Sequence, residues 1–395
     1  MKLAASFSRL GTETAFEVLA RARALEAQGR SIVHLEIGEP DFDTPANIRE
    51  AAKRALDQGY THYGPSAGLP EARKAVAEYV SRTRGVPVAP EETIIVPGGK
   101  PIIFFTIMAL VDPGDEVIYP NPGFPIYESM INYVGGAPVP LPIREEHEWD
   151  FDPAEFERLL TPKTKLVILN SPANPTGGVM SAATMERVAR ALRDKAPQAM
   201  LLTDEIYSRI VYEGKHLSLL SLPGMKERAI LLDGFSKTWA MTGWRLGYGV
   251  GPKWVIDAMA KLATNDHSCT ASFAQIAAME ALMGPQDSVT AMVAEFKKRR
   301  DVIVKGLNAL PGVTCKTPSA AFYVFPCIKG TGLKSKALAD ALLSEAGVAC
   351  LPGTSFGSFG EGYLRFSYAN SVANIEKALA AMAKALPKLA AVAAK

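Results

Sequence analysis

Residues 229–237 read AILLDGFSK, and this stretch decides the fold of the chain. Its first residues are continuously apolar, which is typical of a strand that is buried on both faces, and polar residues follow at once. Residues 165–170, KLVILN, and residues 199–204, AMLLTD, repeat the pattern. Helical patterns lie between several such runs. This alternation predicts an α/β domain with a mostly parallel sheet.

The predicted strands and helices place the domains along the chain. The strands are Thr93–Val96, Glu116–Tyr119, Lys165–Leu169, Ala199–Thr203, Ala229–Leu232 and Leu246–Val250. A helix is expected over Ser181–Lys195, with Ser181 as its N-cap. Another is expected over residues 11–30, ending at Gly29.

From about residue 270 onward, long helices precede short strands around Ala321–Phe325 and Tyr363–Ser367, and a further helix starts near Ile375. This change of pattern predicts a second, smaller domain of α+β type. We expect residues 46–280 to form the large domain and residues 281–395 the small one. Residues 1–45 should form an N-terminal arm and helix that join the small domain.

Composition excludes several classes of partner. The chain has 395 residues, and its 43 Lys and Arg nearly balance its 41 Asp and Glu, for a formal net charge of +2. This balance gives no footprint for nucleic acid or for an anionic membrane. No apolar run is long enough to span a bilayer, and the N-terminus makes a poor signal peptide.

The 4 cysteines are dispersed, and none forms a C-x-x-C pair. A zinc site or a disulfide framework is therefore not expected, and the pattern favours a reducing, cytoplasmic setting.

Polar residues gather directly after the predicted strands, where ligands of open parallel sheets bind. The segments that follow the strands are Pro97–Pro101, Pro120–Phe124, Asn170–Gly177, Asp204–Tyr207 and Asp233–Lys237. Together they predict one site built from dispersed segments.

Gly98-Gly99-Lys100 opens a helix, with Pro101 suited to its first turn. Free backbone N–H groups and the positive end of the helix dipole favour a phosphate at this point. A plain tight turn would explain the same residues. Arg245 could grip a phosphate with its planar fork of donors, and Arg365 could hold a carboxylate in the same way or form a surface salt bridge.

Asp204 ends an apolar strand, where a carboxylate needs a cationic partner such as a protonated pyridine nitrogen. Its alternative role is to cap a helix. Lys237 lies beside the apolar residues Phe235 and Trp239, so burial could lower its pKa and favour the neutral amine that attacks an aldehyde. Considered alone, Lys237 fits an exposed loop lysine better than a reactive amine.

These motifs, taken together, resemble those of the class I/II, fold-type I aminotransferases that depend on pyridoxal 5'-phosphate. The resemblance rests on Asn170–Gly177 (NSPANPTG), Asp204–Tyr207 (DEIY) and Ser236–Tyr248 (SKTWAMTGWRLGY). Gly38–Phe42 (GEPDF) and Tyr63–Pro70 (YGPSAGLP) fit the same family, as does the segment that begins at Arg365. The matches span essentially the whole chain in order, and they are most similar to the aspartate aminotransferase subgroup common in bacteria.

The resemblance implies a large three-layer αβα domain and a role for each matched residue. Lys237 would be the Schiff-base lysine and the proton shuttle, and Asp204 would keep the pyridine nitrogen protonated. Tyr207 and Asn174 would bond the phenolic oxygen, and Phe124 would stack on the ring. The residues implied around the phosphate are Gly99, Lys100, Ser236 and Arg245.

The resemblance also implies a substrate site and a dimer. Arg365, with Asn174 and the backbone of Gly38, would bind the substrate's α-carboxylate, and Phe124 would border the substrate. Tyr63 would reach the phosphate of a neighbouring subunit, which implies a homodimer with shared active sites. The implied reaction is a ping-pong transfer of an amino group from an L-amino acid to a 2-oxo acid such as 2-oxoglutarate.

The substrate stays open in the sequence. Phe124 stands where tryptophan is often found and has no N–H to donate, and the residues after Lys100, IIFFTIM, offer no cation for a side-chain carboxylate. Aspartate, aromatic and neutral amino donors are all consistent with this pattern.

Three rival functions bear comparison. A carbon–sulfur β-lyase on the same fold would use the same cofactor residues. A regulator that has kept the cofactor would usually carry a DNA-binding segment. A nicotinamide dehydrogenase would require a G-x-G-x-x-G turn after the first strand, and the sequence has none there.

Overall fold

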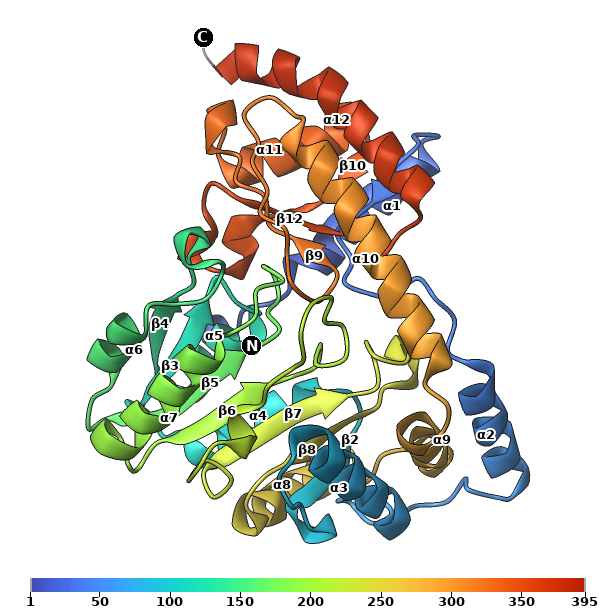
Figure 1. Ribbon diagram of the computed structural model, residues 1–395, viewed down its shortest axis with the longest axis vertical. Helices are drawn as coiled ribbons and strands as arrows, with labels where there is room; N and C mark the ends of the chain where they lie inside the picture. The colour runs from blue at the N-terminus through green and yellow to red at the C-terminus, as the bar shows by residue number, and fades with distance from the viewer. Residues whose placement is uncertain (1, 394–395) are drawn as a thin grey trace.

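A seven-stranded sheet forms the centre of the larger unit of the molecule, in a computed structural model that describes residues 2–393 (Figure 1). The strand order is β2-β8-β7-β6-β5-β3-β4. Strand β8 runs antiparallel to both of its neighbours, and the remaining pairs are parallel. The strands are β2 (Thr93–Val96), β3 (Glu116–Asn121), β4 (Ala137–Pro142), β5 (Thr164–Asn170), β6 (Met200–Asp204), β7 (Ala229–Gly234) and β8 (Gly247–Val250).

Helices cover both faces of this sheet, which confirms the predicted three-layer α/β fold. Along β5, Leu166 and Ile168 pack on one side while Val167 and Leu169 pack on the other, because successive side chains of a strand point to opposite faces. The first face is covered by α4 (Lys100–Leu110), α5 (Ile126–Val134) and α8 (Lys253–Asp266). The second is covered by α2 (Ala46–Asp57), α3 (Pro70–Arg84), α6 (Pro153–Leu159), α7 (Ala182–Lys195) and α9 (Ser272–Met283).

Two local features of this domain bear on the predictions. Ser181 caps α7 as expected, since its side chain accepts a hydrogen bond from the backbone of Thr184. Strand β4 was not predicted, because its sequence, APVPLP, alternates with prolines. Proline cannot donate to a strand ladder, and β4 tolerates it because it lies at the edge of the sheet.

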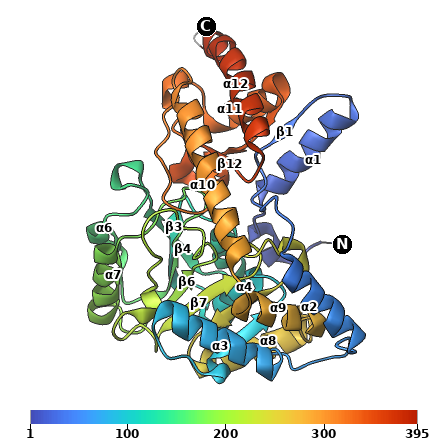
Figure 2. The same ribbon diagram turned by 45° about the vertical axis from the view of Figure 1, so that its right-hand side comes forward.

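A smaller unit follows at the C-terminal end (Figure 2). Its antiparallel sheet has the order β11-β12-β9. Its elements are α10 (Asp287–Asn308), β9 (Tyr323–Val324), α11 (Ser335–Ala341), β10 (Val348–Ala349), β11 (Leu351–Pro352), β12 (Leu364–Ser367) and α12 (Val372–Ala393). The predicted strands near 321–325 and 363–367 are therefore present and shorter than expected.

The N-terminal segment contacts this smaller unit. Helix α1 (Thr14–Ala27) packs through Ala22 against Leu343, and β1 (Val33–His34) pairs in parallel with β10. The predicted helix over residues 11–30 is thus shorter, and Gly29 follows it with φ of +84°. The domain boundaries at residues 45 and 280 stay predictions. Within residues 2–393, no helix combines the length and the apolar character that a membrane crossing requires.

A buried ion-pair network ties α3 to the central sheet. Arg84 ends α3, and its guanidinium donates to Glu205 over 2.9 Å and to Asp233 over 2.6 Å. All three side chains are almost fully buried. Burial opposes the charge of Arg84, but Glu205 and Asp233 outweigh burial and raise its pKa. Because Glu205 follows β6 and Asp233 lies near the end of β7, Arg84 links the ends of two neighbouring strands.

Replacing Arg84 with Met should destabilise the fold. The change removes the cation that Asp233 and Glu205 share, and Glu205 keeps its pair with His216 over 2.7 Å. We therefore expect the free energy of unfolding to fall by about 3–5 kcal/mol. Urea denaturation followed by circular dichroism measures this change. Lys253→Met is the matched control, because Lys253 pairs with Asp257 on the exposed surface of α8 and should contribute little. Equal stability of the Arg84 and Lys253 variants would contradict the account.

Candidate active site

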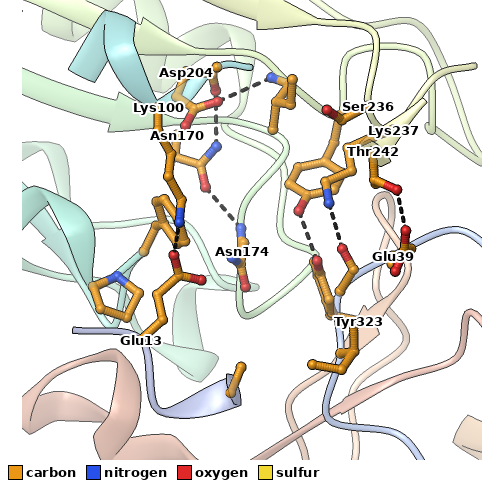
Figure 3. A pocket seen from close by; sticks show the side chains of 18 of the residues that line it. Glu13, Glu39, Lys100, Asn170, Asn174, Asp204, Ser236, Lys237, Thr242 and Tyr323 are labelled. Carbon is orange, nitrogen blue, oxygen red and sulfur yellow. Dashed lines mark hydrogen bonds and ion pairs between the residues drawn. The ribbon is translucent and has the colours of Figure 1, made fainter. Parts of the chain in front are cut away.

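A cavity of about 510 Å³ lies at the carboxyl ends of the central parallel strands (Figure 3). Asn170 and Asp204 are the last residues of β5 and β6, and Lys237 follows β7 closely. The N-terminal segment contributes Glu13, and the smaller unit contributes Arg365. Segments that lie far apart in the sequence therefore meet in one cavity, at the position where parallel sheets bind ligands.

Asp204 is the last residue of strand β6, and only 5% of its surface is exposed. One carboxylate oxygen accepts a hydrogen bond from the hydroxyl of Tyr127 over 2.6 Å, and the other accepts from the backbone N–H of Ile206 over 3.2 Å. Burial raises the pKa of Asp204 to about 6, although these two hydrogen bonds favour the charged form. Both donors are neutral, so the site would gain from a cationic ligand beside this carboxylate.

Lys237 projects into the cavity from the loop after β7, and its amine donates to the backbone carbonyl of Gly38. Burial lowers the pKa of Lys237 to about 8, against a smaller raising effect of Glu39. The neutral amine is therefore much more abundant near physiological pH than it would be at the ordinary lysine pKa of 10.5. Neutral lysine is the nucleophile that attacks a carbonyl carbon.

Donors for an anion gather where α4 begins. Gly99 is the N-cap of this helix and Lys100 its first residue, so their backbone N–H groups lie at the positive end of the helix dipole. Gly98 has φ of +89°, and a Cβ at this position would lie 2.2 Å from Nη2 of Arg245. Only glycine leaves room for that guanidinium against the turn. Ser236 and Arg245 line the same cavity.

Arg365 lies in β12 with 4% of its surface exposed. Its guanidinium packs 4.5 Å from the ring centre of Tyr323 and 4.9 Å from that of Phe356, and it donates to Asn174 over 3.2 Å. Another of its nitrogens donates to the backbone carbonyl of Glu36. Within residues 2–393, its Nε is buried and has no hydrogen-bond partner. Burial lowers the pKa of Arg365, and an incoming carboxylate would offset that desolvation.

Most of the residues predicted for the site meet in this cavity. Those that line it are Gly38, Gly99, Lys100, Phe124, Asn174, Asp204, Tyr207, Ser236, Lys237, Arg245 and Arg365. Tyr63 does not, and it is 91% exposed. The individual roles given to these residues stay predictions. The side chain of Lys100 pairs with Glu13, so the predicted phosphate contact of Lys100 would come from its backbone N–H.

Several residues of the site were not found from the sequence. Tyr127 bonds Asp204 from within α5, where a tyrosine in an apolar helix carries no signal of its role. Tyr323 bonds the hydroxyl of Tyr207 over 2.8 Å, and Asn170 accepts from the backbone of Asn174 over 2.9 Å. Asn170 is the first residue of the Asn170–Gly177 motif, but no role was predicted for its side chain. Lys100 was predicted for the site, but its contact with Phe124, whose ring centre lies 5.8 Å from the Lys100 amine, was not.

The chemistry of the cavity fits pyridoxal 5'-phosphate on three counts. The buried carboxylate of Asp204, with neutral donors only, suits a protonated ring nitrogen. Lys237 offers an amine with a lowered pKa for the aldehyde. The start of α4 and Arg245 offer donors for the phosphate dianion.

Known proteins are similar to this chain over nearly its whole length. The family model for aminotransferase class I and II matches residues 30–382. The aspartate aminotransferase of Pyrococcus abyssi is 42% identical, over 90% of this chain and 92% of its own. The aromatic-amino-acid aminotransferase 2 of Thermococcus litoralis is 42% identical, over 91% and 93%.

Solved structures agree with these sequence relatives. The crystal structure of the aspartate aminotransferase from Rhizobium meliloti has a TM-score of 0.94 at 36% identity, and the match covers 98% of this chain and 99% of that one. Sequence, fold and cavity thus lead to one assignment. The chain belongs to the class I and II aminotransferases, which act on amino acids and 2-oxo acids with pyridoxal phosphate as cofactor.

Proposed function

We propose that the cavity at the carboxyl ends of the sheet is the active site of this aminotransferase, with Lys237 as the residue that binds the cofactor covalently. The observation that carries the proposal is the buried amine of Lys237, whose pKa is lowered to about 8 by burial within a cavity that also holds Asp204 and Arg365. An amine that is partly neutral near pH 8 can attack a carbonyl, and it can later accept a proton.

Pyridoxal phosphate, when bound, supplies an aldehyde carbon that receives the amino group and a ring that withdraws electrons from the substrate's Cα. Asp204 serves this chemistry by keeping the ring nitrogen protonated. Its negative charge is stabilised by Tyr127 and by the backbone of Ile206. Nζ of Lys237 removes the proton from the substrate's Cα and then donates a proton to the aldehyde carbon of the cofactor. One lysine therefore acts as both base and acid.

Arg365 orients the substrate. Its guanidinium is held in place by Tyr323 and Phe356, and its Nε is free to donate to the α-carboxylate. Asn174 accepts a hydrogen bond from the same guanidinium and borders the substrate. Because the aromatic rings and the bond to Glu36 restrict its motion, Arg365 loses little further freedom when the substrate binds.

The proposed reaction transfers an amino group from an aspartate-like, aromatic or neutral L-amino acid to a 2-oxo acid such as 2-oxoglutarate. Relatives named aspartate aminotransferase and aromatic-amino-acid aminotransferase are equally similar to this chain, which supports keeping these donor classes. Their names also support amino-group transfer over the β-lyase alternative.

A homodimer with shared active sites is part of the proposal. Tyr63 lies outside the cavity and is 91% exposed, so its implied contact with a phosphate requires a second copy of the chain. We also propose a cytoplasmic location, which is supported by four cysteines that form no disulfide within the described residues.

Replacing Lys237 with Ala should abolish transamination while cofactor stays bound non-covalently. The variant loses both the covalent attachment and the base, so we expect the turnover number to fall by at least about 10⁴-fold. The measurement is formation of the amino acid product with 2-oxoglutarate as acceptor. Lys336→Ala is the matched control, because Lys336 is an exposed lysine of α11. Wild-type turnover by the Lys237→Ala variant would overturn the assignment.

The pH dependence of cofactor capture tests the state of Lys237 separately. A lysine with a lowered pKa is protonated and unreactive below that pKa and neutral above it. The rate at which apoprotein captures pyridoxal phosphate should therefore rise with pH up to about 8 and then level off. Stopped-flow absorbance reads this rate. A rate that keeps rising toward pH 10, as expected for an exposed lysine, would contradict the assigned environment.

A further inference from the structure

Lys100 and Glu13 form an ion pair inside the cavity. Lys100 is the first residue of α4, one of the helices that cover the central sheet. Glu13 directly precedes α1 in the N-terminal segment. Figure 3 shows the Lys100 side chain extended toward the Glu13 carboxylate. The Glu13 side chain is only 18% exposed, and that of Lys100 is 43% exposed.

This pair is the part of the cavity left to interact with a substrate side chain. The charged residues that line the cavity are Glu13, Glu39, Lys100, Asp204, Lys237, Arg245 and Arg365. The side chains of Asp204, Lys237, Arg245 and Arg365 have proposed roles toward the cofactor or the α-carboxylate, and Glu39 accepts a hydrogen bond from Thr242. Lys100 and Glu13 remain. The apolar residues Phe16, Ile103 and Phe124 line the same cavity, and the amine of Lys100 lies 5.8 Å from the ring centre of Phe124.

The pair is neutral as a whole, which sets its response to a substrate's charge. A second carboxylate on the substrate would have to take Lys100 from Glu13, and it would leave Glu13 without its cation next to another negative charge. An apolar side chain makes no such demand. It can contact the apolar wall while the ion pair stays intact.

We propose that Glu13 is a specificity-determining residue that neutralises Lys100 and thereby favours amino donors with an apolar or aromatic side chain over donors with a side-chain carboxylate. The inference rests on the proposed function, since it assumes that Arg365 holds the α-carboxylate in this cavity. Without Glu13 the preference would be the opposite, because the ammonium group of an unpaired Lys100 attracts substrates with two carboxylates.

Glu13→Gln tests the proposal, because it removes the charge and keeps the shape of the side chain. The half-reaction of the holoenzyme is measured with aspartate and with phenylalanine. The ratio of kcat/KM for aspartate to that for phenylalanine should rise at least about tenfold, as expected for a newly available charge-assisted hydrogen bond. Glu17→Gln is the matched control, since Glu17 is an exposed carboxylate of α1 that does not line the cavity. Its ratio should equal that of the wild type.

Binding of unreactive analogues gives a readout that is independent of turnover. Calorimetry with succinate should show at least about tenfold tighter binding to Glu13→Gln than to wild type, and 3-phenylpropionate should show no such gain. Adding Lys100→Met to Glu13→Gln should remove the gain for succinate, because the cation is then absent.

The outcomes separate this inference from the proposed function. A wild-type enzyme that transfers no amino group from any donor overturns the proposed function. A wild-type enzyme that transfers amino groups, with Glu13→Gln unchanged in its donor ratio and in succinate affinity, overturns the role of Glu13 alone. A gain for succinate that survives Lys100→Met also overturns it.

Discussion

The buried ion pairs of Arg84 with Glu205 and Asp233 hold together the ends of β6 and β7, and these strand ends carry part of the site. Carboxylates in the interior of a protein need a cation, and Arg84 supplies one to two strand ends at once. Asp204 lies directly before Glu205, yet its own partners are neutral. Glu205 and Asp233 therefore have a cationic partner within the protein, whereas the carboxylate of Asp204 can pair with a cationic ligand.

The electrostatics of the cavity follow from that imbalance. Burial raises the pKa of Asp204 and lowers the pKa of Lys237, so it favours the neutral form of both side chains. A cofactor with a cationic ring nitrogen and an aldehyde satisfies the two groups together. Arg365 is the third such group, because its buried Nε has no hydrogen-bond partner within the described residues and can donate to a carboxylate. The burial of these three groups without suitable partners costs free energy. Cofactor and substrate recover this free energy when they bind.

Much of this arrangement could be predicted from the sequence, for identifiable reasons. Continuous apolar runs that end in polar residues marked the buried parallel strands, and the polar residues themselves marked the cavity. Strand β4 was missed because its prolines hid it, and only its position at the sheet edge explains it. Tyr127 and Glu13 were missed because their contacts join segments that are distant in sequence. Local patterns carry no information about such partners.

The central claim is that Lys237 binds the cofactor covalently, and chemical trapping tests it most directly. Holoenzyme reduced with borohydride, digested and mapped by mass spectrometry should carry the mass of the reduced cofactor on the peptide that contains Lys237. The account predicts this label at Lys237 and at no other lysine. A label on Lys100, or no stable label at all, would contradict it.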